Sequence, residues 1–313
     1  MQLEDRWLRE TYVDLLMESA RQDERICIVE ADLMKAAGTG RFAEQFPERT
    51  VNVGVAEANM IGVAAGLSNM GKIPFTHTFT PFSTRRVCDQ VTLSVAYAGL
   101  NVKIMGSDPG VTAELNGGTH MSMEDVAIMR NIPGMIIFEP TDSAQLKKAF
   151  PQILEHYGPF YIRLLRRNAV RIFDDHCEFT LGKGIVLKEG ADVTIVASGI
   201  MTAEALEAGE VLMAEGIRAE VINIHTVKPL DRPLIISSAR KTRAVVTAEN
   251  GSILNGLGSA VAECLGENCP TMMKRVGVQD CFGQVGLTED LKKAYGLTAE
   301  NIITAAKEVI SQK

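Results

Sequence analysis

Apolar runs and amphipathic stretches alternate along most of this chain. In its first half, the runs typical of buried strands are residues 26–32, 73–79, 101–106, 134–140 and 160–165. Between them, the spacing of apolar residues and the enrichment in Ala and Gly predict helices over residues 8–20, 58–70 and 83–98. Continuous apolar strands separated by helices are typical of parallel sheets, so we expect a sheet covered by helices on both faces.

A charged and irregular stretch, residues 166–189, interrupts this rhythm, and a second series of elements follows it. Strands are expected over residues 192–199, 219–224 and 243–250, and helices over 201–215, 255–265, 287–295 and 299–310. Thr288 and Thr298 are expected to be the N-caps of the last two helices. The sequence therefore predicts an α/β fold of two doubly wound, mainly parallel-sheet domains, residues 1–170 and 191–313, joined by a linker, residues 171–190.

Composition narrows the classes of partner. The net charge of −7 argues against nucleic acid or an acidic membrane surface as the main partner. The N-terminus has no signal-like apolar core, and the sequence has no apolar run long enough to cross a membrane. Six cysteines without a CxxC pair and five scattered histidines predict buried free thiols, a cytoplasmic location and no metal ligands in this chain.

One carboxylate has an unusual setting. Glu57 is the only formal charge in VNVGVAEANMIGVAAGLSNM, residues 51–70. A carboxylate in such apolar surroundings loses solvation energy unless it has a partner. In one interpretation, it bonds the free backbone N–H groups at the start of a helix. In the other, it is a desolvated carboxyl group held ready to exchange a proton with a ligand, and the residues alone leave both open.

An aromatic segment, HTFTPFSTRR, residues 77–86, places Phe79 and Phe82 at the end of a strand and in the turn beyond it. Two rings at this position form either a platform for a flat ligand ring or ordinary core packing. Arg85 and Arg86 follow directly, and either bind an anion or solvate a helix.

A long polar loop, residues 106–125, follows another buried strand and carries Asp108, Asn116 and His120 close to Gly117 and Gly118. It leaves the carboxyl end of that strand, which is the edge of a parallel α/β sheet where ligands bind. Loops of this length are usually functional or disordered, so we expect this one to contribute to a site.

These features occur in an order that resembles the carboxyl-terminal half of a transketolase, supplied as a separate subunit. The matching segments in the first domain are GVAEANM (54–60), TFTPF (78–82), GGTH (117–120), EDVAIMR (124–130) and PTD (140–142). In the second domain they are TVKPLD (226–231), NGLGSAV (255–261) and GVQDCFGQVG (277–286). The resemblance covers nearly the whole chain and depends on the ordered set rather than on one motif.

The resemblance implies thiamine diphosphate chemistry, in which a two-carbon ketol unit passes from a ketose, expected to be a phosphate, to an aldose. In that family, the glutamate matching Glu57 contacts the ring nitrogen of the cofactor's aminopyrimidine. Phe79 and Phe82 would form the wall beside that ring, and Asp32 matches an aspartate near the cofactor. His120 matches a histidine that faces the reacting carbons.

The residues that would contact the sugar agree less well with the family. Arg9 and Arg166 match arginines that hold a sugar phosphate, a task that suits guanidinium groups. Asp108 lies in the same loop, but Asn116 replaces the family's aspartate and Ser107 a family histidine. We therefore expect sugars other than the standard pentose phosphate pair.

One family motif is missing. The GDG motif and later Asn that hold the diphosphate and its metal do not occur in this sequence. The resemblance therefore implies that an amino-terminal transketolase subunit holds the diphosphate and Mg²⁺ or Ca²⁺, in an assembly of two copies of each chain. The alternatives are a β subunit of a 2-oxo acid dehydrogenase, a deoxyxylulose phosphate synthase-like enzyme, and a non-catalytic interaction subunit of the same fold.

Overall fold

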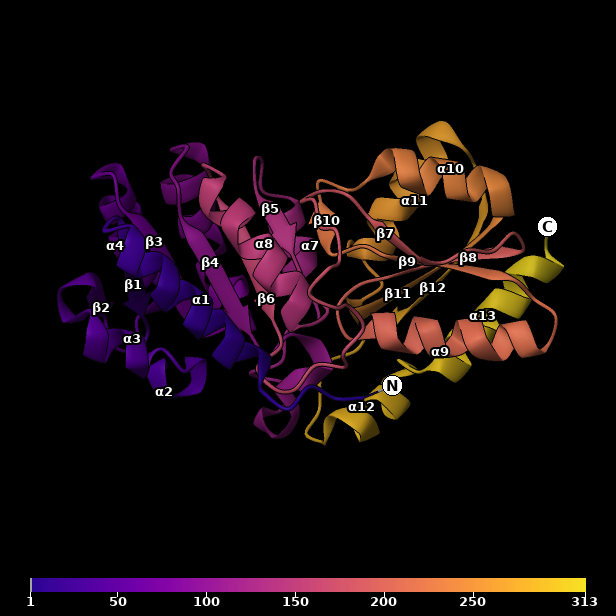
Figure 1. The fold of residues 1–313 in the computed structure, drawn as a ribbon, viewed down its shortest axis with the longest axis horizontal. Coiled ribbons are helices and arrows are strands. Elements are labelled where there is room, and N and C mark those ends of the chain that lie inside the picture. Colours follow the sequence, from indigo (N-terminus) through magenta and orange to yellow (C-terminus); the bar gives the residue numbers. More distant parts are fainter. Residues whose placement is uncertain (1) are drawn as a thin grey trace.

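The computed structural model describes residues 2–313 and contains two β-sheets, which lie side by side along the long axis of the molecule (Figure 1). The first sheet has the strand order β10-β5-β6-β4-β3-β1-β2. Its strands are β1 (Ile26–Glu30), β2 (Thr50–Asn52), β3 (Ile73–Phe79), β4 (Lys103–Ser107), β5 (Ile136–Phe138), β6 (Phe160–Leu164) and β10 (Thr226–Lys228). Its neighbouring strands are parallel except β10 and β5, so the predicted mainly parallel sheet is confirmed.

Helices cover both faces of this sheet. Ile28 packs in one core with α1 (Leu8–Gln22) and α8 (Ser143–Glu155). Its neighbour Val29 packs in another core with α4 (Glu57–Asn69), the π-helical segment η3 (Val91–Tyr97) and α7 (Asp125–Arg130), because adjacent strand residues face opposite sides. The short helical segments are α2 (Met34–Ala37), α3 (Gly40–Gln45), η1 (Pro47–Arg49), α5 (Thr80–Ser83), η2 (Arg85–Val87), α6 (Cys88–Gln90) and η4 (Gly110–Asn116).

The second sheet has the strand order β12-β11-β8-β9-β7. Its strands are β7 (Ile185–Lys188), β8 (Val193–Ala197), β9 (Ala219–Asn223), β11 (Ala244–Ser252) and β12 (Met272–Val278). In Figure 1, α10 (Arg232–Thr242) and α11 (Leu257–Asn268) lie on one side of it, and α9 (Met201–Ala214) and α13 (Ala299–Ser311) on the other. The remaining helix, α12 (Thr288–Tyr295), contacts η4 of the first domain.

The two domains are more closely joined than the sequence indicates. β7 lies inside the segment predicted to be a linker, yet it pairs antiparallel with β9 at the edge of the second sheet. β10 comes from the second half of the chain and completes the first sheet. The core around α4 also continues into the second domain, where Ile222 and Leu257 belong to it. The domains therefore share a strand and an apolar core.

Three local predictions differ from the structure. Residues 85–97 of the helix predicted over 83–98 are helical, but the helix starts only after Thr84, because the Ser83 and Thr84 hydroxyls donate to the carbonyls of Met105 and Thr80 and the Thr84 backbone leaves helical geometry. Thr288 is not an N-cap, because its hydroxyl donates to Glu114, whereas Thr298 caps α13 as predicted. The cysteines are free but not all buried, because Cys281 lies in an exposed loop.

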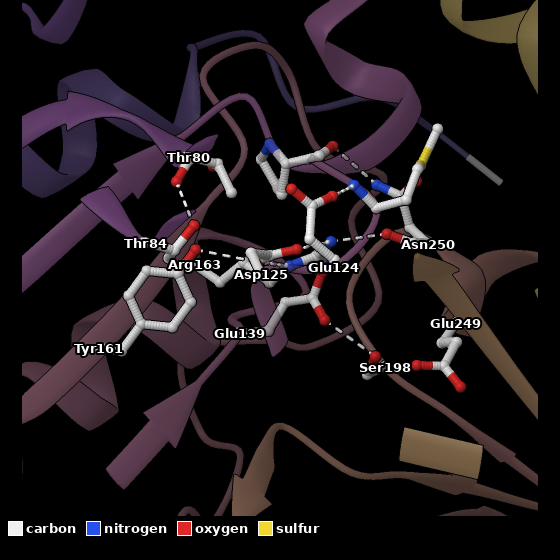
Figure 2. A network of polar contacts seen from close by, with 12 residues as sticks. Thr80, Thr84, Glu124, Asp125, Glu139, Tyr161, Arg163, Ser198, Glu249 and Asn250 are labelled. Carbon is white, nitrogen blue, oxygen red and sulfur yellow. Dashed lines mark hydrogen bonds and ion pairs between the residues drawn. The ribbon is translucent and has the colours of Figure 1, made fainter. Parts of the chain in front are cut away.

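A buried ion cluster ties the two domains together (Figure 2). Arg163, on β6, has a side chain that is 1% exposed. Its Nε donates to Asp125 Oδ2 at 2.7 Å, its Nη1 to Glu139 Oε1 at 2.5 Å, and its Nη2 to the carbonyl of Asn250 in the second domain at 2.6 Å. The other Glu139 oxygen accepts the Ser198 hydroxyl of the second domain at 2.8 Å. The cluster therefore fixes the position of β11 relative to β6.

We expect the variant Arg163→Met to lose about 3–5 kcal/mol of unfolding free energy, because it leaves two buried carboxylates without their cation. The measurement is urea unfolding at neutral pH. Arg232→Met is the control, because its ion pair with Glu267 lies at the surface and is screened by solvent, so its loss should change the unfolding free energy far less. Equal losses in the two variants would contradict the role of the cluster.

Candidate active site

Glu57 is the first residue of α4, and its carboxylate is buried, with an exposed fraction of 4%. The residue before it, Ala56, has no side-chain cap bond. The hydrogen bond of the carboxylate is with Arg86, whose Nη1 donates to Oε1 at 2.6 Å. Since the partner is a side chain and not the backbone of α4, the helix-start interpretation of this acid is not supported.

The aromatic segment forms a cluster beside Glu57. The ring centroids of Phe79 and Phe82 are 6.3 Å apart, and His120 lies edge-on to both, 6.0 Å from Phe79 and 5.1 Å from Phe82. The Arg86 guanidinium lies over the Phe82 ring, 3.8 Å from its centroid. The Thr80 hydroxyl donates to the Ser107 carbonyl at 2.8 Å, which fixes the turn to the end of β4. The cluster therefore lies at the carboxyl edge of the sheet, as predicted for ligands.

Charged groups extend the cluster on its other side. The Cζ of Arg166, which follows β6, lies 6.0 Å from the Phe79 ring centroid, and its Nε lies 3.2 Å from Asp108 Oδ1. Within residues 2–313, neither oxygen of Asp108 has a hydrogen-bond donor. Burial raises the pKa of Asp108 to about 6, against the opposing effect of Arg166. Arg9 on α1 donates to the Ala36 carbonyl, and burial, followed by the charge of Arg166, lowers its pKa.

The structure connects most of the predicted site residues, but not all of them. A continuous series of contacts runs from Glu57 through Arg86, Phe82, His120, Phe79 and Arg166 to Asp108. Ser107 is buried at the end of β4 beside this series. Asp32 and Asn116 are exposed, and among residues 2–313 no hydrogen bond or ion pair joins their side chains to it. The position of Asp32 and Asn116 near a ligand stays a prediction.

The sequence did not identify Arg86 as a site residue. It left open an anion partner or solvation for both Arg85 and Arg86. The structure separates the two: Arg85 pairs with Glu124 at 2.7 Å, whereas Arg86 pairs with Glu57. The spacing from Phe82 gave no signal for Arg86, because the Thr84 backbone between them leaves helical geometry.

Residues 2–313 contain neither a metal-binding cluster of their own nor a membrane-spanning helix. No group of three or more of their His, Cys, Asp or Glu side chains is placed to hold a metal ion. None of the helices in these residues combines the length and the apolar character needed to span a bilayer.

Comparison with known proteins places both domains. Residues 7–171 match the transketolase pyrimidine binding domain, and residues 182–302 match the transketolase C-terminal domain. The chain is 68% identical to the 6-deoxy-6-sulfo-D-fructose transketolase subunit SqwH of Clostridium sp. (strain MSTE9), covering 100% of this chain and 97% of that subunit. It is 37% identical to a 1-deoxy-D-xylulose-5-phosphate synthase of Heliobacterium modesticaldum, covering 96% of this chain but 46% of that enzyme. A split-gene transketolase, solved as an inactive beta4 tetramer, superposes with a TM-score of 0.90 at 46% identity, covering 97% of this chain and 98% of that one.

The chain therefore belongs to the transketolase family of thiamine-dependent enzymes. Within that family it is the carboxyl-terminal subunit of a transketolase-type transferase, consisting of the pyrimidine-binding and C-terminal domains. The resemblance inferred from the sequence is confirmed.

The raised pKa of Asp108 gives a prediction about stability. Because burial disfavours the ionised form, the native protein loses stability as pH rises from the ordinary pKa near 4 to the raised value of about 6, and is unaffected above that. Asp108→Asn cannot ionise, so its unfolding free energy relative to the wild type should be higher at pH 7.5 than at pH 4.5, by about 2 kcal/mol. Urea unfolding at the two pH values measures this difference, and a pH-independent difference would contradict it.

Proposed function

We propose that this chain is the carboxyl-terminal subunit of a two-subunit, thiamine diphosphate-dependent transketolase whose ketose donor is 6-deoxy-6-sulfo-D-fructose. The observation that carries this proposal is the buried Glu57 carboxylate beside the Phe82 ring, in a chain 68% identical to a subunit named for that sugar. The substrate name belongs to the relative, and identity along the full length of both chains supports its transfer.

The residues of the cluster fit the pyrimidine half of thiamine diphosphate. A buried carboxylate next to an aromatic face suits a flat ring with a nitrogen that shares a proton. When bound, the cofactor supplies the carbon nucleophile that carries the two-carbon unit. Glu57 would hold a proton at its carboxylate oxygen, Phe79 and Phe82 would exclude water, and Asp32 would lie near the cofactor. His120 would face the substrate carbons from the edge of the Phe82 ring.

The charged side of the cluster suits the anionic end of the sugar. Arg9 and Arg166 offer guanidinium groups, which recognise tetrahedral oxyanions by several N–H donors. Asp108 holds Arg166 by the ion pair at 3.2 Å. Ser107 and Asn116, both within residues 106–125, would contact the sugar itself. A sulfonate at carbon six is an anion of the kind that this arrangement can bind.

The other half of the site would come from an amino-terminal transketolase subunit. This chain spans 97% of its sulfosugar relative but 46% of the deoxyxylulose phosphate synthase that it also resembles. The part of the chain that the structure describes offers no cluster of metal ligands. We propose that the partner holds the diphosphate and Mg²⁺ or Ca²⁺, in a cytoplasmic heterotetramer of two copies of each chain.

The proposed activity is tested by co-purifying this chain with its amino-terminal partner and titrating thiamine diphosphate and Mg²⁺. Ketol transfer from 6-deoxy-6-sulfo-D-fructose should exceed transfer from fructose 6-phosphate. A preference for fructose 6-phosphate would contradict the proposed substrate. Oxidative decarboxylation of a 2-oxo acid would contradict the proposed reaction class.

In the same assay, Glu57→Gln should assemble normally but lose about 100-fold or more of the transfer rate, because the amide keeps the shape but cannot take up the proton. Size-exclusion chromatography checks the assembly. Turnover close to the wild-type rate would remove Glu57 from the proton-handling role.

Arg86 offers a test of the pyrimidine site that does not require turnover. Its flat guanidinium lies on Phe82 and donates to Glu57, the two contacts proposed for the pyrimidine ring, so ring binding must displace it. We expect Arg86→Ala to tighten binding of 4-amino-5-hydroxymethyl-2-methylpyrimidine to the isolated chain by about 10-fold, measured by calorimetry.

Arg85→Ala is the matched control, because this neighbouring arginine has a similar exposure but pairs with Glu124. It should leave the affinity unchanged. Weaker binding in Arg86→Ala than in the control would mean that Arg86 supports Glu57 while the ring is bound, and would contradict displacement.

A further inference from the structure

We propose that Asn250, in the C-terminal domain, is a positioning residue that holds the active-site loop, residues 107–120, in its working conformation. Only the role of this loop in substrate binding rests on the proposed function. It concerns how a domain that contributes none of the cluster residues controls the geometry of the cluster.

Asn250 lies on β11, close to the carboxyl end of that strand, and is 1% exposed. Its Oδ1 accepts the backbone N–H of Val111 at 3.0 Å, and its Nδ2 donates to the carbonyl of Pro109 at 2.9 Å. If the amide were rotated by about 180°, its NH2 group would face the Val111 N–H and its oxygen would face the Pro109 carbonyl. The two contacts therefore define the orientation of the amide. One side chain therefore holds the backbone on both sides of Gly110, at the start of the loop.

The loop at this point has a conformation that needs such support. Asp108 and Glu114 adopt positive φ values of 57° and 50°, which are unfavourable for residues with a Cβ. Gly110 also has a positive φ, of 53°, and a Cβ there would collide with Asn250 Oδ1. Local backbone strain persists only where the surrounding contacts determine it. Asn250 lies against the segment between the two strained residues.

Other contacts of the C-terminal domain hold the rest of the loop and the residues directly after it. Val111, Ala113, Met121 and Met123 pack in the core of the second domain with α9 and α13. Glu114 accepts the Thr288 hydroxyl of α12, and the N–H of Ser252 donates to the Met123 carbonyl at 2.7 Å. The loop thus belongs to the first domain by sequence, and to the second domain by packing.

The consequence reaches the cluster through Asp108, which directly precedes Pro109. Removing the Asn250 amide would leave the Val111 N–H buried without a partner, and the Pro109 carbonyl would keep only its bonds from Thr112. The segment would then relax, and Asp108 would shift away from Arg166, which in the proposed function binds the anionic end of the sugar. His120, at the far end of the loop, would also lose its fixed place against Phe82.

The experiment compares Asn250→Ala with Asn223→Ala in the assembled holoenzyme. Asn223 is the matched control, because it is 0% exposed and also joins the domains, through Gln145 and Thr141. Those contacts lead to the start of α8 and not to the loop. Hydrogen exchange of peptides covering residues 107–121 and the KM for the ketose are measured in both variants. Asn250→Asp, which keeps an acceptor for Val111 but loses the donor to Pro109, is the milder variant if Asn250→Ala does not fold.

Asn250→Ala should raise exchange in residues 107–121 by about 10-fold or more and raise KM by about 10-fold, with an intermediate effect for Asn250→Asp. Asn223→Ala should leave both close to the wild type, although both alanine variants lower the melting temperature. Equal exchange of the loop in the two alanine variants would overturn the proposal. A wild-type complex without ketol transfer would overturn the proposed function instead, and the exchange result would still decide the role of Asn250.

Discussion

The arrangement of the two domains depends on the charge of one buried side chain. Arg163 is almost fully enclosed, and its guanidinium has partners on α7, after β5 and on β11. A buried ion pair adds little net stability compared with apolar residues of the same shape, but removing one member is costly. The cluster therefore acts mainly as a geometric constraint: each partner has to be in place, and one of them, Asn250, belongs to the second domain. The shared apolar core around α4 and the strand β10 strengthen the same arrangement.

This constraint explains why the candidate site lies where it does. β3, β4 and β6 end at the same edge of the first sheet, and the residues that follow them provide Phe82, Asp108 and Arg166. Glu57 reaches this edge from the start of α4. Its buried carboxylate is held by a cation that also lies on an aromatic ring, so the group is neither an uncompensated charge nor a cap of its own helix. In the proposed function, a flat, proton-sharing ring would take the place of that cation.

Much of the fold could be predicted from the sequence, because long apolar strands such as those ending at Glu30 and Phe79 are buried on both faces. α8 was not predicted, since Pro151 interrupts its helical pattern and only the Asp142 cap marks its start. The edge strands β2, β7 and β10 are only three or four residues long, and none of them is buried along its whole length. At the candidate site, residue types and order pointed to Glu57, Phe82 and His120, which the structure joins in one series of contacts.

The tertiary contacts of individual side chains could not be predicted from the sequence. Arg85 and Arg86 cannot be distinguished in the sequence, and only their different ion-pair partners in the structure separate them. The role of Asn250 is even harder to predict, because its partners Val111 and Pro109 are 139 and 141 residues away in the sequence. The strained conformation of two non-glycine residues in this loop requires stabilising contacts from other parts of the chain. The second domain provides these contacts. It is therefore part of the candidate site, even though none of its side chains joins the ring cluster.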